Sequence, residues 1–353
     1  MPVSIVVGGQ FGSEGKGKVS LELVRMATER RIAVVRVGGP NSGHTAYDRA
    51  GQKFALRQLP AGAVDRNVDV VFPAGSFIDV DVLQSEIELL DYPRDRIFIS
   101  PYANVITPEQ KAWEQEAGLV SGIGSTGSGV GAAVMATVAR DASNFPLRRH
   151  DAAHCEPLEH YLSDTTLLMR QWLNARARVI IEGTQGFGLS LYDGGFWPKA
   201  TSRATTAAAA LAETGLSPMD VDEVALVIRS YPIRVAGNSG PLPGETSWEQ
   251  ISDSMETAND IREFTTVTKK LRRVGQFDAS LVQAAILSNN PTMIILNHLD
   301  YIGAQSDLND ECSKLSRFIG TVSNSIGQPV THFGFSDRGI IPNLKKPTRA
   351  FGS

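Results

Sequence analysis

The sequence predicts an α/β fold with a large, mostly parallel central sheet flanked by helices and a P-loop-like nucleotide-binding loop at its start. Short runs rich in β-branched residues alternate with helical patterns along the chain. Several of these runs end in glycine-rich turns, and the 353 residues include 33 glycines and 18 prolines. No linker or internal repeat interrupts the pattern. We therefore expect one domain over residues 1–353, with inserted helical and loop excursions.

Composition narrows the function classes. The net charge is −4 at pH 7 and no long basic block occurs, so a polymeric nucleic acid is not expected as a partner. No apolar run reaches the roughly eighteen residues of a membrane span. Residues 1–10 lack the features of a signal peptide. The two cysteines, Cys155 and Cys312, form no metal motif and fit a reducing compartment. We expect a cytoplasmic protein without membrane contact.

The N-terminal stretch predicts a phosphate-binding loop. A strand over Ser4–Val7 leads into five glycines, at positions 8, 9, 12, 15 and 17, and a helical pattern follows Lys18. Glycines let backbone N–H groups converge on an anion at a helix N-terminus, and Lys16 can reach a phosphoryl group. The loop is not a standard Walker A motif, because Gln10 occupies the position of its first glycine.

The remaining elements follow from hydrophobic periodicity. Strands are expected at 32–37, 56–59, 68–72, 97–100, 179–182, 223–231 and 292–296, with a last strand ending in 331–338. Helices are expected at 81–90, from the cap Thr107 onward, and at 132–139, 156–175, 204–212 and 278–287. Residues 241–244 are expected to be irregular and exposed.

Several polar residues stand in turns after these strands. His44 lies in a flexible polar loop and is a candidate acid–base residue. Residues 122–131 alternate glycine with serine and threonine, which suits a second phosphate or a flexible linker. Gln185 is placed to read a neutral polar ligand group. Thr201 to Arg203 precede a predicted helix and offer another anion site.

Two later segments leave alternatives open. Residues 264–275 hold Lys269, Lys270, Arg272 and Arg273 among three threonines, as in a carboxylate clamp or a solvated basic face. Asp300 follows the strand at 292–296, where it can accept from a base edge or cap a turn.

Taken in order, these segments resemble the motifs of the adenylosuccinate synthetase family. The matching stretches are the opening loop, Asn41–Thr45, Gly124–Gly127, Glu182–Gly186, Thr268–Arg273 and Leu299–Asp300. The resemblance spans nearly the whole chain and fits the family's compact, archaeal-like branch. It implies a two-step ligation that uses Mg²⁺. A γ-phosphoryl group passes from a nucleoside triphosphate to the 6-oxygen of a purine nucleotide, and the amine of L-aspartate then displaces it.

The resemblance also implies roles for residues. His44 would act as an acid, Lys16 would neutralise the moving phosphoryl group, Gln185 would orient the purine oxygen, and Ser13 stands at the position of the family's general base. The expected acceptor-nucleotide residues are Ser13, Asn41, Ser125, Thr126, Gln185, Thr201, Lys270 and, from the second subunit of a homodimer, Arg140. Aspartate would contact Thr266, Val267, Thr268 and Arg272.

The expected donor-triphosphate residues fall in five segments, which are Gly12, Glu14, Gly15, Lys16, Gly17 and Lys18; Gly43, His44 and Thr45; Arg272; Asn297, Leu299 and Asp300; and Gly334. Ser13 and the carbonyl of Gly43 would hold Mg²⁺.

One departure from the family pattern matters most. The family has aspartate, its general base, where this chain has Ser13. A serine is a weaker base and removes a charged metal ligand. Three interpretations follow: an inactive nucleotide-binding regulator, an ordinary synthetase using IMP, aspartate and GTP, or an enzyme with another substrate.

We favour a change of substrate. A small hydroxyl leaves room for the 2-amino group of guanine and can accept its hydrogen bond. The variant resembles phage-encoded members of the family that act on dGMP and make 2-amino-2′-deoxy-N6-succinyladenylate for diaminopurine DNA. The proton from ring nitrogen 1 would pass through Ser13 to water or to a phosphate oxygen.

Two further departures concern other positions. His298 replaces the lysine that packs on the donor's guanine, which favours ATP or dATP over GTP, and Ser128 stands where the family often has arginine.

Overall fold

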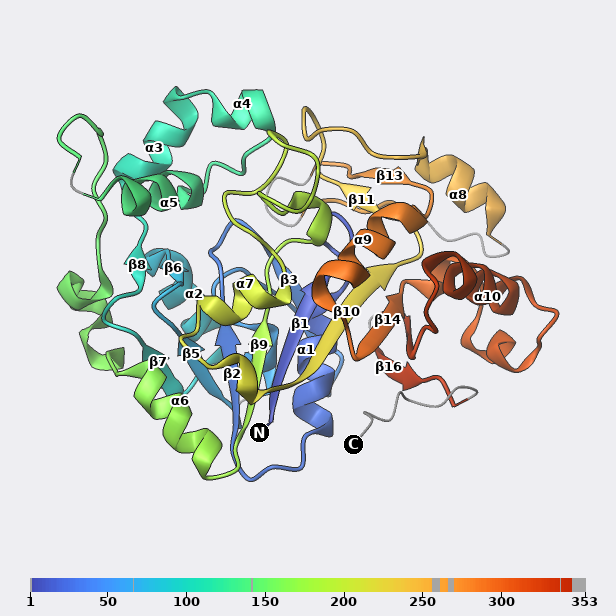
Figure 1. The fold of residues 1–353 in the computed structure, drawn as a ribbon, viewed down its shortest axis with the longest axis horizontal. Helices are drawn as coiled ribbons and strands as arrows, with labels where there is room; N and C mark the ends of the chain where they lie inside the picture. The colour runs from blue at the N-terminus through green and yellow to red at the C-terminus, as the bar shows by residue number, and fades with distance from the viewer. Residues whose placement is uncertain are drawn as a thin grey trace.

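The chain builds its fold around a nine-stranded sheet (Figure 1). The computed structural model describes residues 2–65, 67–140, 142–255, 261–265, 270–336 and 338–344. Within these ranges the strand order is β16-β15-β14-β10-β1-β9-β2-β5-β7. Neighbouring strands are parallel except β15 and β16, which pair antiparallel. The predicted α/β class with a large, mostly parallel sheet is confirmed.

The strands of the main sheet are β1 (Val3–Gly8), β2 (Ile32–Arg36), β5 (Asp69–Phe72), β7 (Ile97–Ile99), β9 (Arg178–Glu182), β10 (Val221–Arg229), β14 (Met293–Asn297), β15 (His332–Phe335) and β16 (Arg338–Pro342). Outside it, the described part of the chain forms three small sheets. They are the hairpin of β3 (His44–Tyr47) and β4 (Lys53–Leu56), the pair β6 (Phe77–Ile78) and β8 (Asn104–Val105), and the trio β11 (Ile233–Arg234), β13 (Arg273–Gly275) and β12 (Glu245–Thr246).

The helices gather in separate groups around the sheet. Figure 1 shows α3, α4 and α5 together beyond one end of the sheet, and α8 and α10 beyond the other. The helices are α1 (Lys16–Met26), α2 (Val80–Leu90), α3 (Pro108–Glu116), α4 (Leu119–Ile123), α5 (Val130–Ala139), α6 (Thr165–Asn174), α7 (Ala207–Ala212), α8 (Trp248–Ser254), α9 (Ala279–Asn289) and α10 (Lys314–Ile326). None of them, in the described ranges, is long and apolar enough to cross a bilayer.

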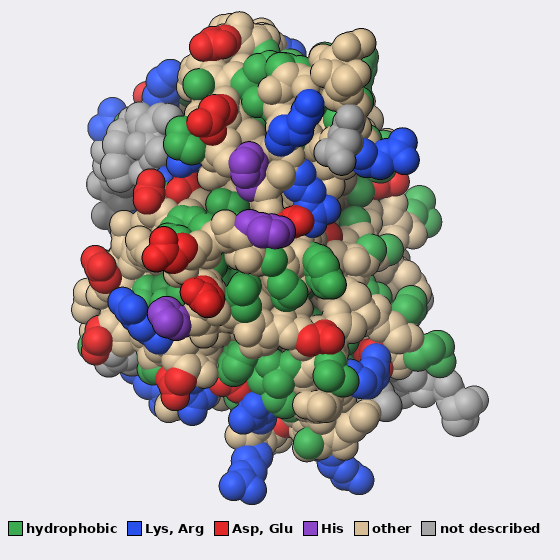
Figure 2. Space-filling view, turned by 90° about the vertical axis from the view of Figure 1, so that its left-hand side faces the viewer, with side chains coloured by type: hydrophobic (Ala, Val, Ile, Leu, Met, Phe, Trp, Pro, Cys, Tyr) green, Lys and Arg blue, Asp and Glu red, His purple; other side chains and the backbone are tan. Residues whose placement is uncertain are grey.

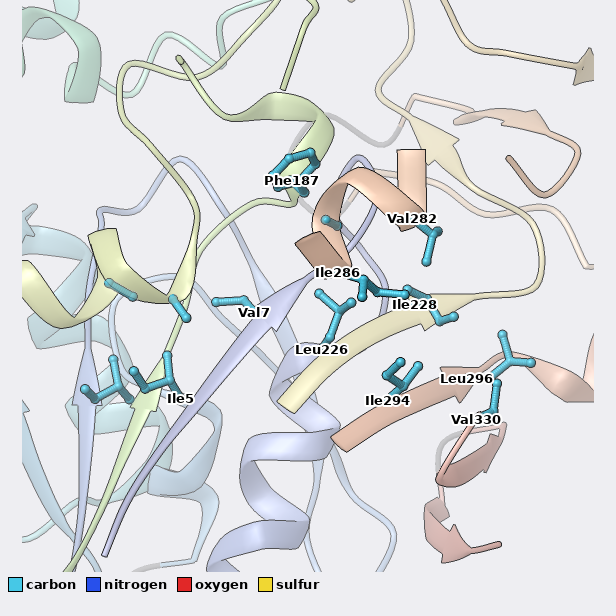
Figure 3. Close-up of a cluster of buried hydrophobic side chains, with 14 of the residues drawn as sticks. Ile5, Val7, Phe187, Leu226, Ile228, Val282, Ile286, Ile294, Leu296 and Val330 are labelled. Carbon is cyan, nitrogen blue, oxygen red and sulfur yellow. The ribbon is translucent and has the colours of Figure 1, made fainter. Parts of the chain in front are cut away.

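Alternate strand residues pack on opposite faces of the sheet, as the two-residue repeat of a strand requires. On one face Ile5, Val7, Leu226 and Leu296 pack with residues of α6, α7, α9 and α10 (Figure 3). On the other face Val6, Ile180 and Val227 pack against α1. Because both faces are covered, the strands read as continuous apolar runs, which is why the sequence identified them.

Three predicted elements are wrong in their bounds. Residues 57–59 do not continue a strand, because their three N–H groups donate to the carboxylate of Glu86 at 2.6–3.0 Å, and the strand is instead β4. The expected helix over 156–175 divides into a 3₁₀ turn at Glu156–Tyr161 and α6. Asp164 caps α6 by accepting from the backbone of Leu167 at 3.0 Å.

The helix expected over 204–212 begins only at Ala207. Thr206 caps it by accepting from the backbone of Ala209. Thr201 to Arg203 therefore do not stand at a helix N-terminus, so the expectation that they precede a helix directly is wrong, while an anion-binding role for Thr201 stays a prediction. The expected last strand is a hairpin of β15 and β16. The predicted cap at Thr107 is confirmed, with a capping box to Gln110.

Candidate active site

Several of the predicted site residues lie in turns at the carboxyl ends of the parallel strands. Four of these strands end on charged or amide side chains that turn out to be central: β2 at Arg36, β9 at Glu182, β10 at Arg229 and β14 at Asn297. In open α/β sheets this edge forms the ligand crevice. The glycine-rich loop after β1 lies among these strand ends, because β1 pairs with both β9 and β10.

The glycine-rich loop folds around a buried carboxylate. Glu14 is fully buried, and its Oε1 accepts from the backbone N–H groups of Gln10 at 3.1 Å and Gly12 at 2.8 Å. Its Oε2 lies 2.8 Å from Nζ of Lys16, which also donates to the carbonyl of Gln185. The structure thus commits the Glu14 side chain inside the loop, so any contact with a donor nucleotide would come from its backbone.

Two glycines make room for this carboxylate. A Cβ on Gly8 would lie 2.5 Å from Glu14 Oε2, and one on Gly186 would lie 2.4 Å from Glu14 Oε1 and from the backbone nitrogen of Gly12. The glycines of the loop and of the 183–186 turn therefore serve close packing as well as backbone freedom. This packing places the opening loop against the Gln185 turn.

His44 is held in a buried cluster rather than in a flexible loop. It is the first residue of β3 and only 6% exposed, so the expectation of a flexible polar loop is wrong. Its Nδ1 lies 2.5 Å from Oε1 of Glu182, and Arg36 Nη1 lies 3.1 Å from the same ring nitrogen. The backbone N–H of Ala61 donates to both oxygens of Glu182, at 3.1 and 2.9 Å.

The electrostatics of this cluster favour a neutral imidazole facing a charged carboxylate. Burial and then the nearby Arg36 guanidinium lower the pKa of His44 to about 4, and Glu182 offsets this only in part. Burial alone would raise the pKa of Glu182, but His44 and Arg36 hold it well below its usual range. Neither Glu182 nor Arg36 was assigned a role from the sequence.

Ser13 is an exposed residue of the loop with a φ of 58°, in the left-handed region. Arg272 Nη1 donates to its hydroxyl oxygen. Arg229 Nη1 donates to its carbonyl oxygen at 2.9 Å and is itself paired with Glu263. Arg229 and Glu263 were also not assigned a role. The sequence offered little indication of a role, since Arg229 is a single charged residue at the end of a strand and Glu263 is one that precedes a basic segment.

The second glycine-rich segment carries another buried carboxylate. Glu114, 1% exposed, accepts from the N–H groups of Gly129 at 3.0 Å, Gly131 at 2.7 Å and Ala132 at 3.2 Å, and from the hydroxyl of Ser125. Three backbone N–H groups at the start of α5 that were expected to bind a phosphate therefore donate to Glu114 instead. The hydroxyls of Thr126 and Ser128 lie 2.8 Å apart.

The 124–131 segment nevertheless approaches other predicted nucleotide residues. A Cβ on Gly131 would lie 4.0 Å from Cβ of Ser202, which is next to Thr201. The ammonium group of Lys199 donates to the carbonyls of Gly122 and Asn238, so the segments around residues 122, 199 and 238 lie together here. Arg140 ends α5 and is exposed, as is Lys270.

The predicted donor segment contacts the opening loop. Nδ2 of Asn297 donates to the carbonyl of Glu14 at 2.7 Å, and a Cβ on Gly334 would lie 1.7 Å from Oδ1 of Asn297. Asp300 accepts from the backbone of Ser336 at 2.8 Å, while Leu299 is fully buried. These contacts bring the two halves of the expected donor site together.

The other predicted positions take different places. Asn41 and Thr45 are partly buried on either side of the exposed Gly43. Thr266, Val267 and Thr268, predicted to bind aspartate, lie outside the described residues. On the face in Figure 2, basic side chains are interspersed with acidic ones among the coloured residues, without the continuous basic stripe that binds polymeric nucleic acid.

Comparison with known proteins identifies the family. A family model described as adenylosuccinate synthetase matches residues 5–152 and 147–309. The adenylosuccinate synthetase of Pyrococcus sp. (strain ST700) is 36% identical over 337 residues, which cover 94% of each chain. That of Methanococcus aeolicus is 35% identical over 338 residues, covering 94% of this chain and 95% of the relative.

Two solved structures share the fold. The succinoaminodeoxyadenylate synthetase of cyanophage S-2L, bound to dGMP and dATP as an energy donor, has a TM-score of 0.80 and 27% identity, covering 97% of this chain and 95% of its own. The adenylosuccinate synthetase of Plasmodium falciparum has a TM-score of 0.82 at 21% identity, with 97% and 100% covered. The chain belongs to the adenylosuccinate synthetase family, whose members are carbon–nitrogen ligases joining aspartate to a purine nucleotide.

The buried His44 predicts a stability difference between pH 7 and pH 5. A lowered histidine pKa means that the unfolded chain takes up a proton below about pH 6.5 that the folded chain refuses until about pH 4. Stability therefore falls as pH falls through this window, by about 2 kcal/mol at pH 5 from this group. Between pH 7 and pH 5, the free energy of unfolding in urea should fall by about 2 kcal/mol less for His44→Gln than for the wild type. Equal losses would contradict the neutral imidazole.

The close packing at Gly186 predicts that Gly186→Ala loses at least about a hundredfold in turnover, because a shift of the loop by a fraction of an ångström displaces Lys16. Initial rates of phosphate release measure this. Gly320→Ala in α10 is the matched control, since its Cβ would meet nothing within 4 Å. Near-normal turnover of Gly186→Ala would show that the loop tolerates the added methyl group.

Proposed function

We propose that this chain joins L-aspartate to carbon 6 of dGMP with hydrolysis of ATP or dATP, giving 2-amino-2′-deoxy-N6-succinyladenylate. The observation that carries the proposal is Ser13, where the family pattern has a catalytic aspartate. Its hydroxyl is exposed in the crevice and held by Arg272. A small neutral side chain at this place leaves room beside ring nitrogen 1 for the 2-amino group that distinguishes guanine from hypoxanthine.

The reaction proceeds in two balanced steps. The 6-oxygen attacks the γ-phosphorus, the bond to the β-phosphate oxygen breaks, and the proton of ring nitrogen 1 leaves through Ser13 to water or to a phosphate oxygen. The amine of aspartate then adds to carbon 6 and loses one proton, and inorganic phosphate departs with the 6-oxygen and takes up that proton. Phosphorylation is needed because a purine oxo group is a poor leaving group.

The charged groups of the opening loop and of the His44 cluster suit this transfer. Lys16, fixed between Glu14 and the carbonyl of Gln185, would meet the γ-phosphoryl group at the start of α1. Glu182 Oε1 lies 2.5 Å from Nδ1 of His44 and Arg36 Nη1 lies 3.4 Å from Nε2, so Nε2 would turn from Arg36 to a phosphate oxygen when the triphosphate binds. An anionic phosphate raises a histidine pKa, so His44 would gain its proton as the triphosphate binds. Gln185 would orient the 6-oxygen.

Mg²⁺ is expected from the family, and the donor set fits it. Among the described residues no three histidine, cysteine, aspartate or glutamate side chains gather as a metal site, and Glu14 and Glu182 are bound to Lys16 and Arg36. Mg²⁺ commonly takes most of its ligands from phosphates and water. The exposed carbonyl of Gly43 and the hydroxyl of Ser13 would hold it, and it would neutralise charge on the triphosphate.

The donor segment supports an adenine donor. His298 replaces the lysine that the family places on guanine, and its ring lies 5.5 Å from that of Tyr301. The cyanophage relative with dATP as energy donor supports the same choice. Asp300, bound to Ser336, would fix the base edge with the Gly334 turn.

We further propose a homodimer. The exposed Arg140 has a φ of 55° at the end of α5, beside Val138, which is 73% exposed. The arginine would reach the 5′-phosphate of the neighbouring subunit, next to Thr126 and Thr201. A single-domain organisation accounts for the continuous central sheet.

An ordinary adenylosuccinate synthetase is the second candidate. It is favoured by the archaeal relatives, which are 33–36% identical and carry that name.

Wild-type turnover separates the two candidates. We expect the purified enzyme with aspartate, Mg²⁺ and ATP to release phosphate with dGMP at least about tenfold faster, as kcat/KM, than with IMP, a ratio equal to about 1.4 kcal/mol of transition-state discrimination. GTP in place of ATP should be the poorer donor. Activity with IMP but not with dGMP would overturn the proposal, and inactivity with both would favour a nucleotide-binding regulator.

Ser13→Asp tests the role of the small hydroxyl. An aspartate would pair with Arg272 and fill the space of the 2-amino group, so kcat/KM for dGMP should fall by about tenfold or more. Aspartate and asparagine both tolerate the left-handed backbone of this position. Ser13→Asn is the matched neutral control, and the steric argument predicts weaker dGMP use there too. Equal or better dGMP turnover in Ser13→Asp would contradict it.

A further inference from the structure

An ion pair between the buried Arg229 and the partly exposed Glu263 contacts Ser13. Arg229 is fully buried, and its guanidinium donates to the carbonyl oxygen of Ser13 at 2.9 Å and to both oxygens of Glu263. Its backbone is fixed as well, because the Gln10 side chain donates to the Arg229 carbonyl at 3.1 Å and accepts from its N–H at 2.9 Å. A single residue of β10 thus clamps the loop at Gln10 and at Ser13.

Glu263 joins this clamp to the residue that holds the Ser13 hydroxyl. Its backbone carbonyl accepts from the N–H of Arg272 at 2.8 Å, and Arg272 in turn donates to the hydroxyl oxygen of Ser13. Ser13 is therefore held twice, at its carbonyl by Arg229 and at its hydroxyl by Arg272, and both arginines are set by Glu263. Such double restraint suits a residue whose φ of 58° needs support from its surroundings.

Glu263 also reaches the donor segment. The hydroxyl of Tyr301 donates to its Oε1 at 2.9 Å, and the Tyr301 ring lies 6.0 Å from the Arg229 guanidinium. The same ring packs at 5.5 Å against His298, whose carbonyl accepts from the hydroxyl of Ser230 at 2.7 Å. One carboxylate thus connects the loop on the acceptor side with residues 298–301 on the donor side.

We infer that Arg229, Glu263 and Tyr301 form a positioning unit that fixes the Ser13 side chain and ties its placement to the donor-base segment. None of the three needs to touch the reacting atoms. The inference rests on the catalytic role proposed for Ser13. A merely structural ion pair would lower stability when broken, but it would not make the effect of Tyr301 on turnover depend on the Ser13 hydroxyl.

Tyr301→Phe is the mildest test. It removes one hydroxyl and keeps the ring contacts with His298, Trp248 and Arg229. Tyr92→Phe is the control, because Tyr92 is a buried tyrosine outside the candidate site whose hydroxyl also donates a hydrogen bond, here to the backbone oxygen of Val68 at 2.6 Å. The thermal unfolding midpoint of each variant is measured together with its turnover rate, so that a loss of stability is distinguished from a loss of activity.

The decisive measurement is kcat for wild type, Ser13→Ala, Tyr301→Phe and the double variant, with whichever of dGMP and IMP the wild type uses better. We expect Tyr301→Phe to lower kcat about threefold or more, and Tyr92→Phe to leave it unchanged. In the Ser13→Ala background the Tyr301→Phe loss should shrink to less than about 1.5-fold, because no hydroxyl remains to be positioned. Residues without contact normally give independent effects.

The outcomes distinguish a failure of the positioning unit from a failure of the role proposed for Ser13. If Ser13→Ala is impaired and the Tyr301→Phe loss is the same factor in both backgrounds, or equals that of Tyr92→Phe, the positioning unit is refuted while the role of Ser13 stands. If Ser13→Ala turns over like wild type, the role proposed for Ser13 fails first. Arg229→Lys, which keeps the charge but not the fork that spans carbonyl and carboxylate, should lower kcat at least as much as Tyr301→Phe.

Discussion

The crevice depends on the carboxylate of Glu14. It collects two backbone N–H groups of the opening loop and the ammonium of Lys16, and it is fully buried while doing so. A buried charge is tolerated only when paired and hydrogen-bonded, so the loop has one low-energy shape. That shape determines where α1 begins and where Lys16 points. It also explains why there is no room for a side chain at Gly8, which ends β1, or at Gly186, in the turn after β9.

The same arrangement recurs around the crevice. Glu182 holds His44 and Arg36, Glu263 holds Arg229, and Glu114 holds three backbone N–H groups at the start of α5. Each carboxylate joins segments that are distant in sequence. Fixed dipoles and charges of this kind stabilise a transition state without reorganising during the reaction. Replacing one partner would leave the other buried without compensation, which makes each pair costly to alter.

The sequence was sufficient for the sheet and insufficient for these pairs. Runs such as Ile32–Arg36 are apolar on both faces and could be read as buried strands, and the cap at Thr107 follows from local chemistry. The partner of His44 is 138 residues away, and no local pattern predicts it. For the same reason the strand predicted at 56–59 extends too far, since Glu86 takes the backbone donors of residues 57–59, and the sequence did not show that Glu114 takes backbone donors at the start of α5.

Ser13 differs from the carboxylates that pair with basic side chains around the crevice, because its own side chain is neutral. Lys16, Arg36 and Arg229 each face a carboxylate, whereas Arg272 donates its Nη1 to a neutral hydroxyl. An aspartate at position 13 would neutralise Arg272, but a serine orients the guanidinium and leaves its charge in the crevice. Nucleotides and aspartate are anions, so in the proposed site the Arg272 guanidinium would strengthen their binding, even with the Glu263 carboxylate nearby. Serine at this position therefore changes the field that substrates meet as well as the space that a purine can occupy.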